Sequence, residues 1–121
     1  MGQAFKPTAL VVENDELQRS LITVLLEESE MDVIQCETAE AAVQVLDQSG
    51  NSLSMVFTDV ELAGPMDGIE LATIAKQRFP DLHVIVTSGA PRLRRLPDGT
   101  TLMVKPWNPI DLLIEAQKSI H

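Results

Sequence analysis

Polar and charged side chains stand at the ends of four separate apolar runs in this chain. They are Glu13 and Asn14, Asp59, Thr87 and Ser88, and Lys105. Two carboxylates and an amide oxygen suit a hard cation that prefers oxygen ligands, Mg²⁺ before Zn²⁺. A hydroxyl and an ammonium group suit the oxygens of a phosphoryl group. An aspartate in such a place can itself accept a phosphoryl group, because aspartyl phosphate is an established covalent intermediate.

The apolar runs that precede these groups predict β-strands. The run Met55–Thr58 ends abruptly in Asp59 and is followed by the loop signal Ala63-Gly64-Pro65, as expected of a strand buried on both faces. The five predicted strands cover 8–12, 32–36, 55–59, 82–87 and 102–104, and the mixed character of the second favours a sheet edge. In a parallel sheet the carboxyl ends of all strands lie at one edge, so the polar groups converge there.

Helix signals alternate with the strands. Asp15, Thr38, Asp67 and Asn108 are predicted N-caps. The apolar stripes that follow at helical spacing are Leu17, Leu21, Val24 and Leu25; Ala39, Ala42, Val43 and Leu46; Leu71, Ala72, Ala75 and Phe79; and Ile110, Leu113, Gln117 and Ile120, with Leu112 and Ala116 beside this last stripe. Between the last two strands, Pro91, Pro97 and Gly99 leave room for only one or two helical turns at 91–96. This alternation predicts one α/β domain, a doubly wound five-stranded parallel sheet with a short or irregular fourth helix.

Composition excludes several classes of protein. The 121 residues carry 18 acids and 9 bases, a net charge of −9, which argues against direct, charge-driven nucleic-acid binding. The only basic cluster is Arg92, Arg94 and Arg95. No apolar stretch approaches the length of a membrane span, so no membrane association is expected. A single cysteine, Cys36, forms no internal disulfide, and we expect a reducing, cytoplasmic compartment.

Taken together, the strand ends resemble the response-regulator receiver domain of two-component signalling, the CheY-like fold, from about Thr8 to Ile120. The set comprises the acidic-type pair Glu13-Asn14, Asp59 followed by Met66-Asp67-Gly68, Thr87-Ser88-Gly89, and Lys105-Pro106. The resemblance implies strand order 2-1-3-4-5, a flexible segment 1–7 and a receiver domain at 8–121. It also implies a signalling switch that assists its own phosphorylation and dephosphorylation and is not otherwise an enzyme.

The resemblance also implies roles for single residues. Asp59 would accept a phosphoryl group from a histidine kinase or a histidine phosphotransfer protein. Glu13, Asn14, Asp59 and the backbone carbonyl of Glu61 would hold Mg²⁺. Thr87 would be the switch hydroxyl that follows the phosphoryl group. Lys105 would contact that group, and its bond to Pro106 would be cis. The output partner cannot be identified from the sequence.

Three features depart from the pattern of this family. Asn14 stands at the second acidic position, so weaker Mg²⁺ binding is expected; Asp15 could replace it, although its N-cap role is favoured. Leu102 occupies the usual aromatic switch position, and the fourth helix is degraded. These departures keep a second hypothesis open, a pseudo-receiver that binds partners without phosphorylation. A phosphatase of the aspartyl-nucleophile type is disfavoured, because its first strand would end in Asp-x-Asp and here ends in Glu13-Asn14-Asp15.

Overall fold

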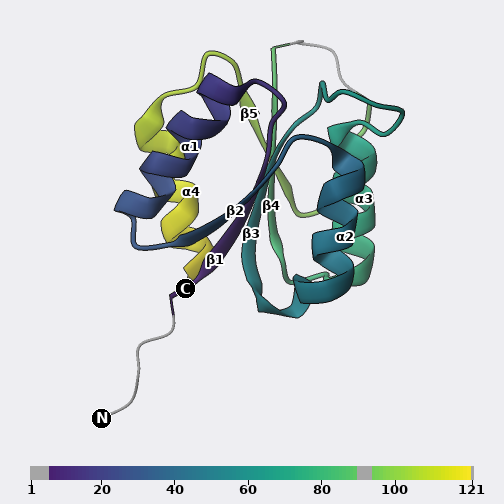
Figure 1. Ribbon diagram of the computed structural model, residues 1–121, viewed down its shortest axis with the longest axis horizontal. Helices are drawn as coiled ribbons and strands as arrows, with labels where there is room; N and C mark the ends of the chain where they lie inside the picture. The colour runs from purple at the N-terminus through teal and green to yellow at the C-terminus, as the bar shows by residue number, and fades with distance from the viewer. Residues whose placement is uncertain (1–5, 90–93, 121) are drawn as a thin grey trace.

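Five parallel strands form one sheet at the centre of the computed structural model, which describes residues 6–89 and 94–120 (Figure 1). The strands are β1 (Thr8–Val12), β2 (Asp32–Cys36), β3 (Leu53–Asp59), β4 (His83–Ser88) and β5 (Thr100–Val104). Their order in the sheet is β2-β1-β3-β4-β5, and every pairing is parallel. The predicted fold class and strand order are therefore confirmed.

Helices cover both faces of the sheet (Figure 1). They are α1 (Glu16–Glu28), α2 (Ala39–Ser49), α3 (Gly68–Arg78) and α4 (Pro109–Ile120), with a short 3₁₀ turn η1 (Gly50–Ser52) after α2. Helices α1 and α4 pack on one face around a core that includes Phe57, and α2 and α3 pack on the other around Val56. Because adjacent strand residues point to opposite faces, β3 serves both cores at once.

The predicted caps are all present. Asp15 accepts from the amide of Gln18, Thr38 from that of Ala41, and Asn108 from that of Ile110, at 2.9, 3.1 and 2.9 Å. Asp67 and Glu70 form a reciprocal capping box at the start of α3. These side chains satisfy amide groups that would otherwise lack partners at helix starts, and thereby fix where each helix leaves the strand-end loops.

Two of the predicted helix faces are wrong. On α1, Leu17 is 83% exposed, and the residues in the core are instead Ile22 and Leu26. On α4 the core residues are Leu112 and Ala116, which are predicted only to lie beside the stripe, while Ile110, Gln117 and Ile120 of the predicted stripe are exposed. Both helices carry apolar residues on more than one side, so spacing alone fits several faces. The stripes of α2 and α3 are correct in their main members.

The connection from β4 to β5 holds no helix in its described part, residues 94–99. The predicted turns at 91–96 fall partly outside the described residues, and Arg92 of the basic cluster lies outside them.

Leu102 pairs with Val86 in the sheet and is 43% exposed, and Val104 pairs with Ser88 and is 52% exposed. Edge strand β5 thus presents apolar side chains that the helices of residues 6–89 and 94–120 leave partly uncovered.

No helix in the described parts of the chain is both long enough and apolar enough to cross a membrane.

Candidate functional site

The carboxyl ends of β1, β3, β4 and β5 bring the predicted site residues to one edge of the sheet. An open depression of about 520 Å³ lies there. Its lining includes Glu13, Asn14, Asp59, Glu61, Gly89 and Lys105. Parallel strands force this convergence, because residues at the same end of each strand must share one edge.

Asp59 is the last residue of β3 and is only 4% exposed. Its two carboxylate oxygens have different partners. Oδ1 accepts from the backbone amide of Glu61 at 3.2 Å, and Oδ2 accepts from Nζ of Lys105 at 2.8 Å. A charge-assisted contact of this kind orients a carboxylate far better than water does. The side chain is therefore fixed in direction while still bordering the depression.

Glu13 lies beside Asp59 and is 2% exposed. Its Oε2 accepts from the amide of Asp15 at 3.0 Å, whereas its buried Oε1 has no partner among the described residues. Burial raises the pKa of Glu13 above its ordinary value, and the negative charge of Asp59 raises this pKa further. The Asp15 amide and the charge of Lys105 oppose these effects without cancelling them. The site thus holds a carboxyl group with unmet hydrogen-bonding capacity.

Lys105 follows β5 and supplies positive charge to these two acids. Burial lowers the pKa of Lys105, but its hydrogen bond to Asp59 and the charges of Asp59, Glu13 and Glu61 outweigh that effect, so the pKa is raised. Its backbone amide donates to the carbonyl of Ser88 at 2.8 Å, and the Lys105–Pro106 bond is cis. The ammonium group remains charged at neutral pH.

Thr87 pairs with Asp59 across β3 and β4 and is 1% exposed. Its carbonyl accepts from the amide of Val60 at 2.9 Å, which ties the strand end to the loop after β3. Its hydroxyl has no hydrogen-bond partner within the described part of the chain. The buried Thr87 hydroxyl can therefore make one more polar contact, next to Asp59 on the neighbouring strand.

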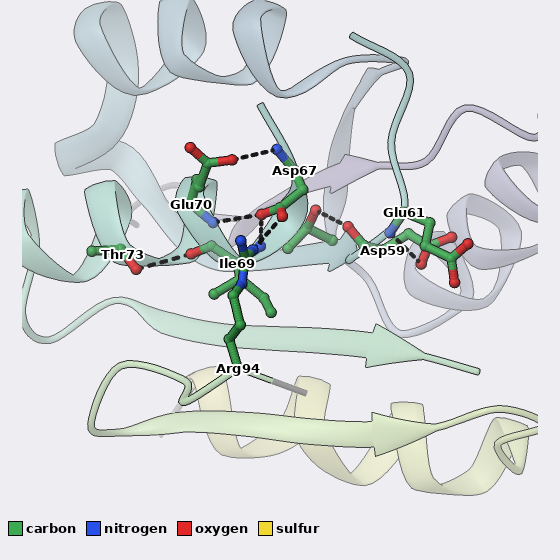
Figure 2. Close-up of polar contacts among 8 residues, drawn as sticks. Asp59, Glu61, Asp67, Ile69, Glu70, Thr73 and Arg94 are labelled. Carbon is green, nitrogen blue, oxygen red and sulfur yellow. Dashed lines mark hydrogen bonds and ion pairs between the residues drawn. The ribbon is translucent and has the colours of Figure 1, made fainter. Parts of the chain in front are cut away.

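The loop after β3 packs directly against the end of that strand. Gly68 has no room for a side chain, because a Cβ there would lie 1.9 Å from the carbonyl oxygen of Asp59. The amide of Gly68 donates to the carbonyl of Val60 at 2.9 Å. Figure 2 shows Asp67, the residue before Gly68, capping α3 through the amides of Ile69 and Glu70. The start of α3 therefore sets the backbone position of Asp59.

Arg94 links this loop to the connection between β4 and β5. Its guanidinium group pairs with Oδ2 of Asp67, the same side chain that caps α3 (Figure 2). The pair is partly exposed, so it contributes little to stability. It nevertheless joins the segment after Gly89 to the segment after Asp59.

The donor set fits a hard divalent cation. Among residues 6–89 and 94–120, no three His, Cys, Asp or Glu side chains surround a common point, so a metal would need other oxygens as well. The buried Oε1 of Glu13 lacks a partner, and the carboxylates of Glu13 and Asp59 are close enough to raise the Glu13 pKa. Asn14 is exposed on the rim of the same depression and offers an amide oxygen. Carboxylate, amide and carbonyl oxygens with water match Mg²⁺.

Three contacts at the site have no signal in the sequence that we recognised. Arg19 donates to the carbonyl of Glu13 at 2.8 Å, Gly68 closes on Asp59, and Arg94 pairs with Asp67. The sequence singles out Gly68 as part of a helix start and of the Met66-Asp67-Gly68 motif, and neither predicts its contact with Asp59. Each contact depends on how a helix or loop is placed in three dimensions, which residue spacing does not specify.

Comparison with known proteins agrees with this geometry. The family model for the response regulator receiver domain matches residues 9–114. The chain is 28% identical over 90 residues to the autoinducer 1 sensor kinase/phosphatase LuxN of Vibrio campbellii, covering 74% of this chain but 10% of LuxN. It is 28% identical to the response regulator receiver protein CpdR of Brucella abortus, covering 92% of this chain and 94% of CpdR.

Among solved structures, a response regulator receiver protein from Sinorhizobium medicae superposes with a TM-score of 0.84 at 21% identity. The match covers 95% of this chain and 94% of that one. At this identity the superposition supports the fold alone. The family match, which spans most of the chain, goes further: this protein belongs to the response regulator receiver domains of two-component systems.

Proposed function

We propose that this receiver domain accepts a phosphoryl group on Asp59, with Mg²⁺, and acts as a signalling switch. The observation that carries the proposal is the fixed carboxylate of Asp59, which borders an open depression while the Glu61 amide and the Lys105 ammonium each hold one oxygen. A nucleophile held in one orientation needs little further ordering to reach the in-line geometry of phosphoryl transfer.

The transfer step requires Asp59, a phosphohistidine on the donor protein and a proton from solvent. An oxygen of Asp59 forms a bond to phosphorus as the P–N bond of a donor phosphohistidine breaks, and the departing imidazole takes up a proton from solvent. Lys105 then stabilises the added negative charge. Thr87, whose buried hydroxyl has no partner in the described structure, would turn toward a phosphoryl oxygen. That movement is the proposed switch.

Glu13, Asn14, Asp59 and the carbonyl of Glu61 would hold the metal. When bound, Mg²⁺ supplies positive charge that offsets repulsion between these carboxylates and the phosphoryl oxygens. The unpartnered Oε1 of Glu13 supports this assignment. Asn14 contributes no charge, so we expect weaker affinity than an acid at that position would give.

The phosphodonor we propose is a histidine kinase or a histidine phosphotransfer protein, in the cytoplasm. A likeness to LuxN, whose name describes a sensor kinase/phosphatase, supports this class of partner.

Intact-protein mass spectrometry tests the proposal. The protein is incubated with acetyl phosphate and millimolar Mg²⁺, and we expect the mass of one phosphoryl group to be added. Asp59→Asn should abolish the adduct. Asp81→Asn, which removes the same charge from an exposed turn before β4, should leave it unchanged. Absence of an adduct on the wild-type protein would reject phosphorylation at this site.

Asn14 supports one alternative, a pseudo-receiver that binds its partner without phosphorylation. In that case neither acetyl phosphate nor a phosphorylated histidine donor would modify the protein. Partner binding would then be the same for wild type and Asp59→Asn. Phosphorylation that depends on both Mg²⁺ and Asp59 would exclude this alternative.

A further inference from the structure

Arg19 lies on α1 and reaches back to the loop that follows β1. Its Nη1 donates to the carbonyl of Glu13 at 2.8 Å, and its Nε donates to the side-chain oxygen of Gln35 at 3.2 Å. Nη1 also lies 3.7 Å from a carboxylate oxygen of Glu37. The Arg19 side chain is only 13% exposed. A guanidinium group so far removed from water stays there only if its N–H groups have acceptors, which Glu13 and Gln35 provide, while Glu37 supplies a nearby negative charge.

The contact with Glu13 completes the restraint of that residue. The Glu13 amide donates to the carbonyl of Cys36 at 3.0 Å, and its carbonyl accepts from Arg19. Its side chain accepts from the amide of Asp15. With both backbone groups and one carboxylate oxygen bonded, the peptide between Glu13 and Asn14 cannot rotate without breaking a charge-assisted hydrogen bond.

We propose that Arg19 is a positioning residue for the metal site. By holding the Glu13 carbonyl on the β2 side, it keeps the Glu13 and Asn14 side chains directed at the depression where Mg²⁺ would bind. This inference rests on the proposed function and adds a residue to it. Partners that orient ligands in this way commonly affect metal affinity by about 10- to 100-fold.

The neutral side chain of Asn14 makes this restraint important in this chain. A carboxylate at position 14 would attract the cation over a distance and could draw a loosely held loop around it. An amide oxygen does so only weakly and must already be in place. Rigid placement by Arg19 reduces the ordering cost of binding, which is how preorganisation increases affinity.

The competing explanation is that Arg19 merely ties α1 to β2 through Gln35. That role predicts a change in unfolding free energy with no particular effect on the loop or on Mg²⁺. The two explanations are separated by Arg19→Gln, which loses the charge and the reach, and Arg19→Lys, which keeps a charged donor near the Glu13 carbonyl. Arg78→Gln is the matched control, because it removes an equal charge from the exposed pair with Asp47.

The experiment has two readouts on the whole chain. Backbone amide NMR shifts of Asn14 and Asp15 without metal report the loop, and a Mg²⁺ titration followed by fluorescence of the single Trp107 reports affinity. We expect Arg19→Gln to move both amide signals and to raise the Kd for Mg²⁺ about 10-fold or more. Arg19→Lys should recover part of the affinity, and Arg78→Gln should leave the Kd at the wild-type value.

An unchanged Kd in Arg19→Gln would overturn the positioning role, as would an equal rise in Arg78→Gln. If Arg19→Gln does not fold, Arg19→Lys decides alone: a wild-type Kd and unmoved Asn14 and Asp15 signals would overturn the proposal. A wild-type protein that binds no Mg²⁺ at millimolar concentration would reject the metal site itself, and Arg19 would then be structural. That failure lies in the wild type and is therefore distinct from a failure confined to the variants.

Discussion

The ammonium of Lys105 lies 2.8 Å from a carboxylate oxygen of Asp59, although β4 stands between their two strands. Glu13, which follows the neighbouring strand β1, lies on the other side of Asp59, so ionisable groups from the ends of β1, β3 and β5 meet where little solvent reaches the two acids. The trio carries two acids and one base when all are ionised. Their charges do not balance, and a bound cation would correct the excess.

Replacing Lys105 with glutamine should destabilise the metal-free protein at pH 7. The raised pKa of Lys105 means that the folded state holds this proton more tightly than the unfolded chain does. Its contribution is therefore complete below the unfolded pKa and is lost only as alkaline pH passes the folded pKa. We expect a loss of about 2 kcal/mol, between the values of exposed and buried pairs, in urea unfolding.

Mg²⁺ should remove much of that deficit. Without a competing ammonium group, Lys105→Gln should bind Mg²⁺ more tightly than wild type, because the two carboxylates then lack their only cation among the described residues. Lys118→Gln, at the exposed pair with Glu115 on α4, serves as the control and should show neither effect. Equal stability of Lys105→Gln and wild type would mean that the pair contributes nothing measurable.

Glu13→Gln should make the protein more stable at neutral pH. The pKa of Glu13 is raised, chiefly by burial, so the folded state binds this proton more readily than the unfolded chain. Stability of the wild type must then fall as pH rises through the interval between the unfolded and folded pKa values. The variant lacks that titration, so its advantage should shrink as pH falls from the raised folded pKa of Glu13 to the ordinary value of about 4.5, and should not change below that value.

Unfolding free energies measured across this pH range test the Glu13 prediction. Glu28→Gln on the exposed end of α1 removes the same charge, and its difference from wild type should vary little with pH. A Glu13→Gln variant that is less stable than wild type at pH 7 would contradict the argument. The same variant should lose Mg²⁺ binding, so the acid would be retained for function at a cost in stability.

The fold and the convergence of the site residues could be predicted because their signals are local or topological. The Asp67 cap is predicted by neighbouring residues in the sequence. An apolar strand that ends in Asp59 must place Asp59 at the carboxyl edge of a parallel sheet. The packed face of α1 could not be predicted, since Leu17 and Ile22 fit helical spacing equally well and only packing separates them. The contact of Arg19 with a backbone carbonyl leaves no trace in residue spacing.

Gly68→Ala should strongly destabilise the protein. The added methyl group would lie 1.9 Å from the Asp59 carbonyl oxygen and 2.7 Å from its carbonyl carbon, so the backbone of Asp59 itself must move. We expect a loss of about 3 kcal/mol, at the upper end for overpacking, measured by urea unfolding. The same variant should be phosphorylated more slowly, because the carboxylate moves with its backbone.

Gly89 provides the matched control for Gly68. It borders the same depression, yet a Cβ at Gly89 would meet no atom within 4 Å. Gly89→Ala should therefore change stability by no more than about 0.5 kcal/mol. Similar losses in both variants would show that general loss of loop flexibility, and not contact with Asp59, is responsible.

Asn14→Asp should tighten Mg²⁺ binding. The variant should be less stable than wild type without metal and more stable than wild type with it. A further carboxylate on the rim adds repulsion to Glu13 and Asp59, so the metal-free variant should be less stable than wild type. An added charge about 4 Å from the cation is worth about 1 kcal/mol or more, so the Kd should fall by about 5-fold or more. Because a ligand that binds only the folded state stabilises it, millimolar Mg²⁺ should make the variant the more stable of the two.

Trp107 fluorescence gives the Kd of Asn14→Asp for Mg²⁺, and thermal unfolding with and without Mg²⁺ shows whether the order of stability reverses. Asn51→Asp in η1, at the opposite edge of the sheet, adds the same charge and should show no reversal. An unchanged Mg²⁺ titration in Asn14→Asp would place Asn14 outside the metal site, and Glu13 and Asp59 would then have to bind the cation without it.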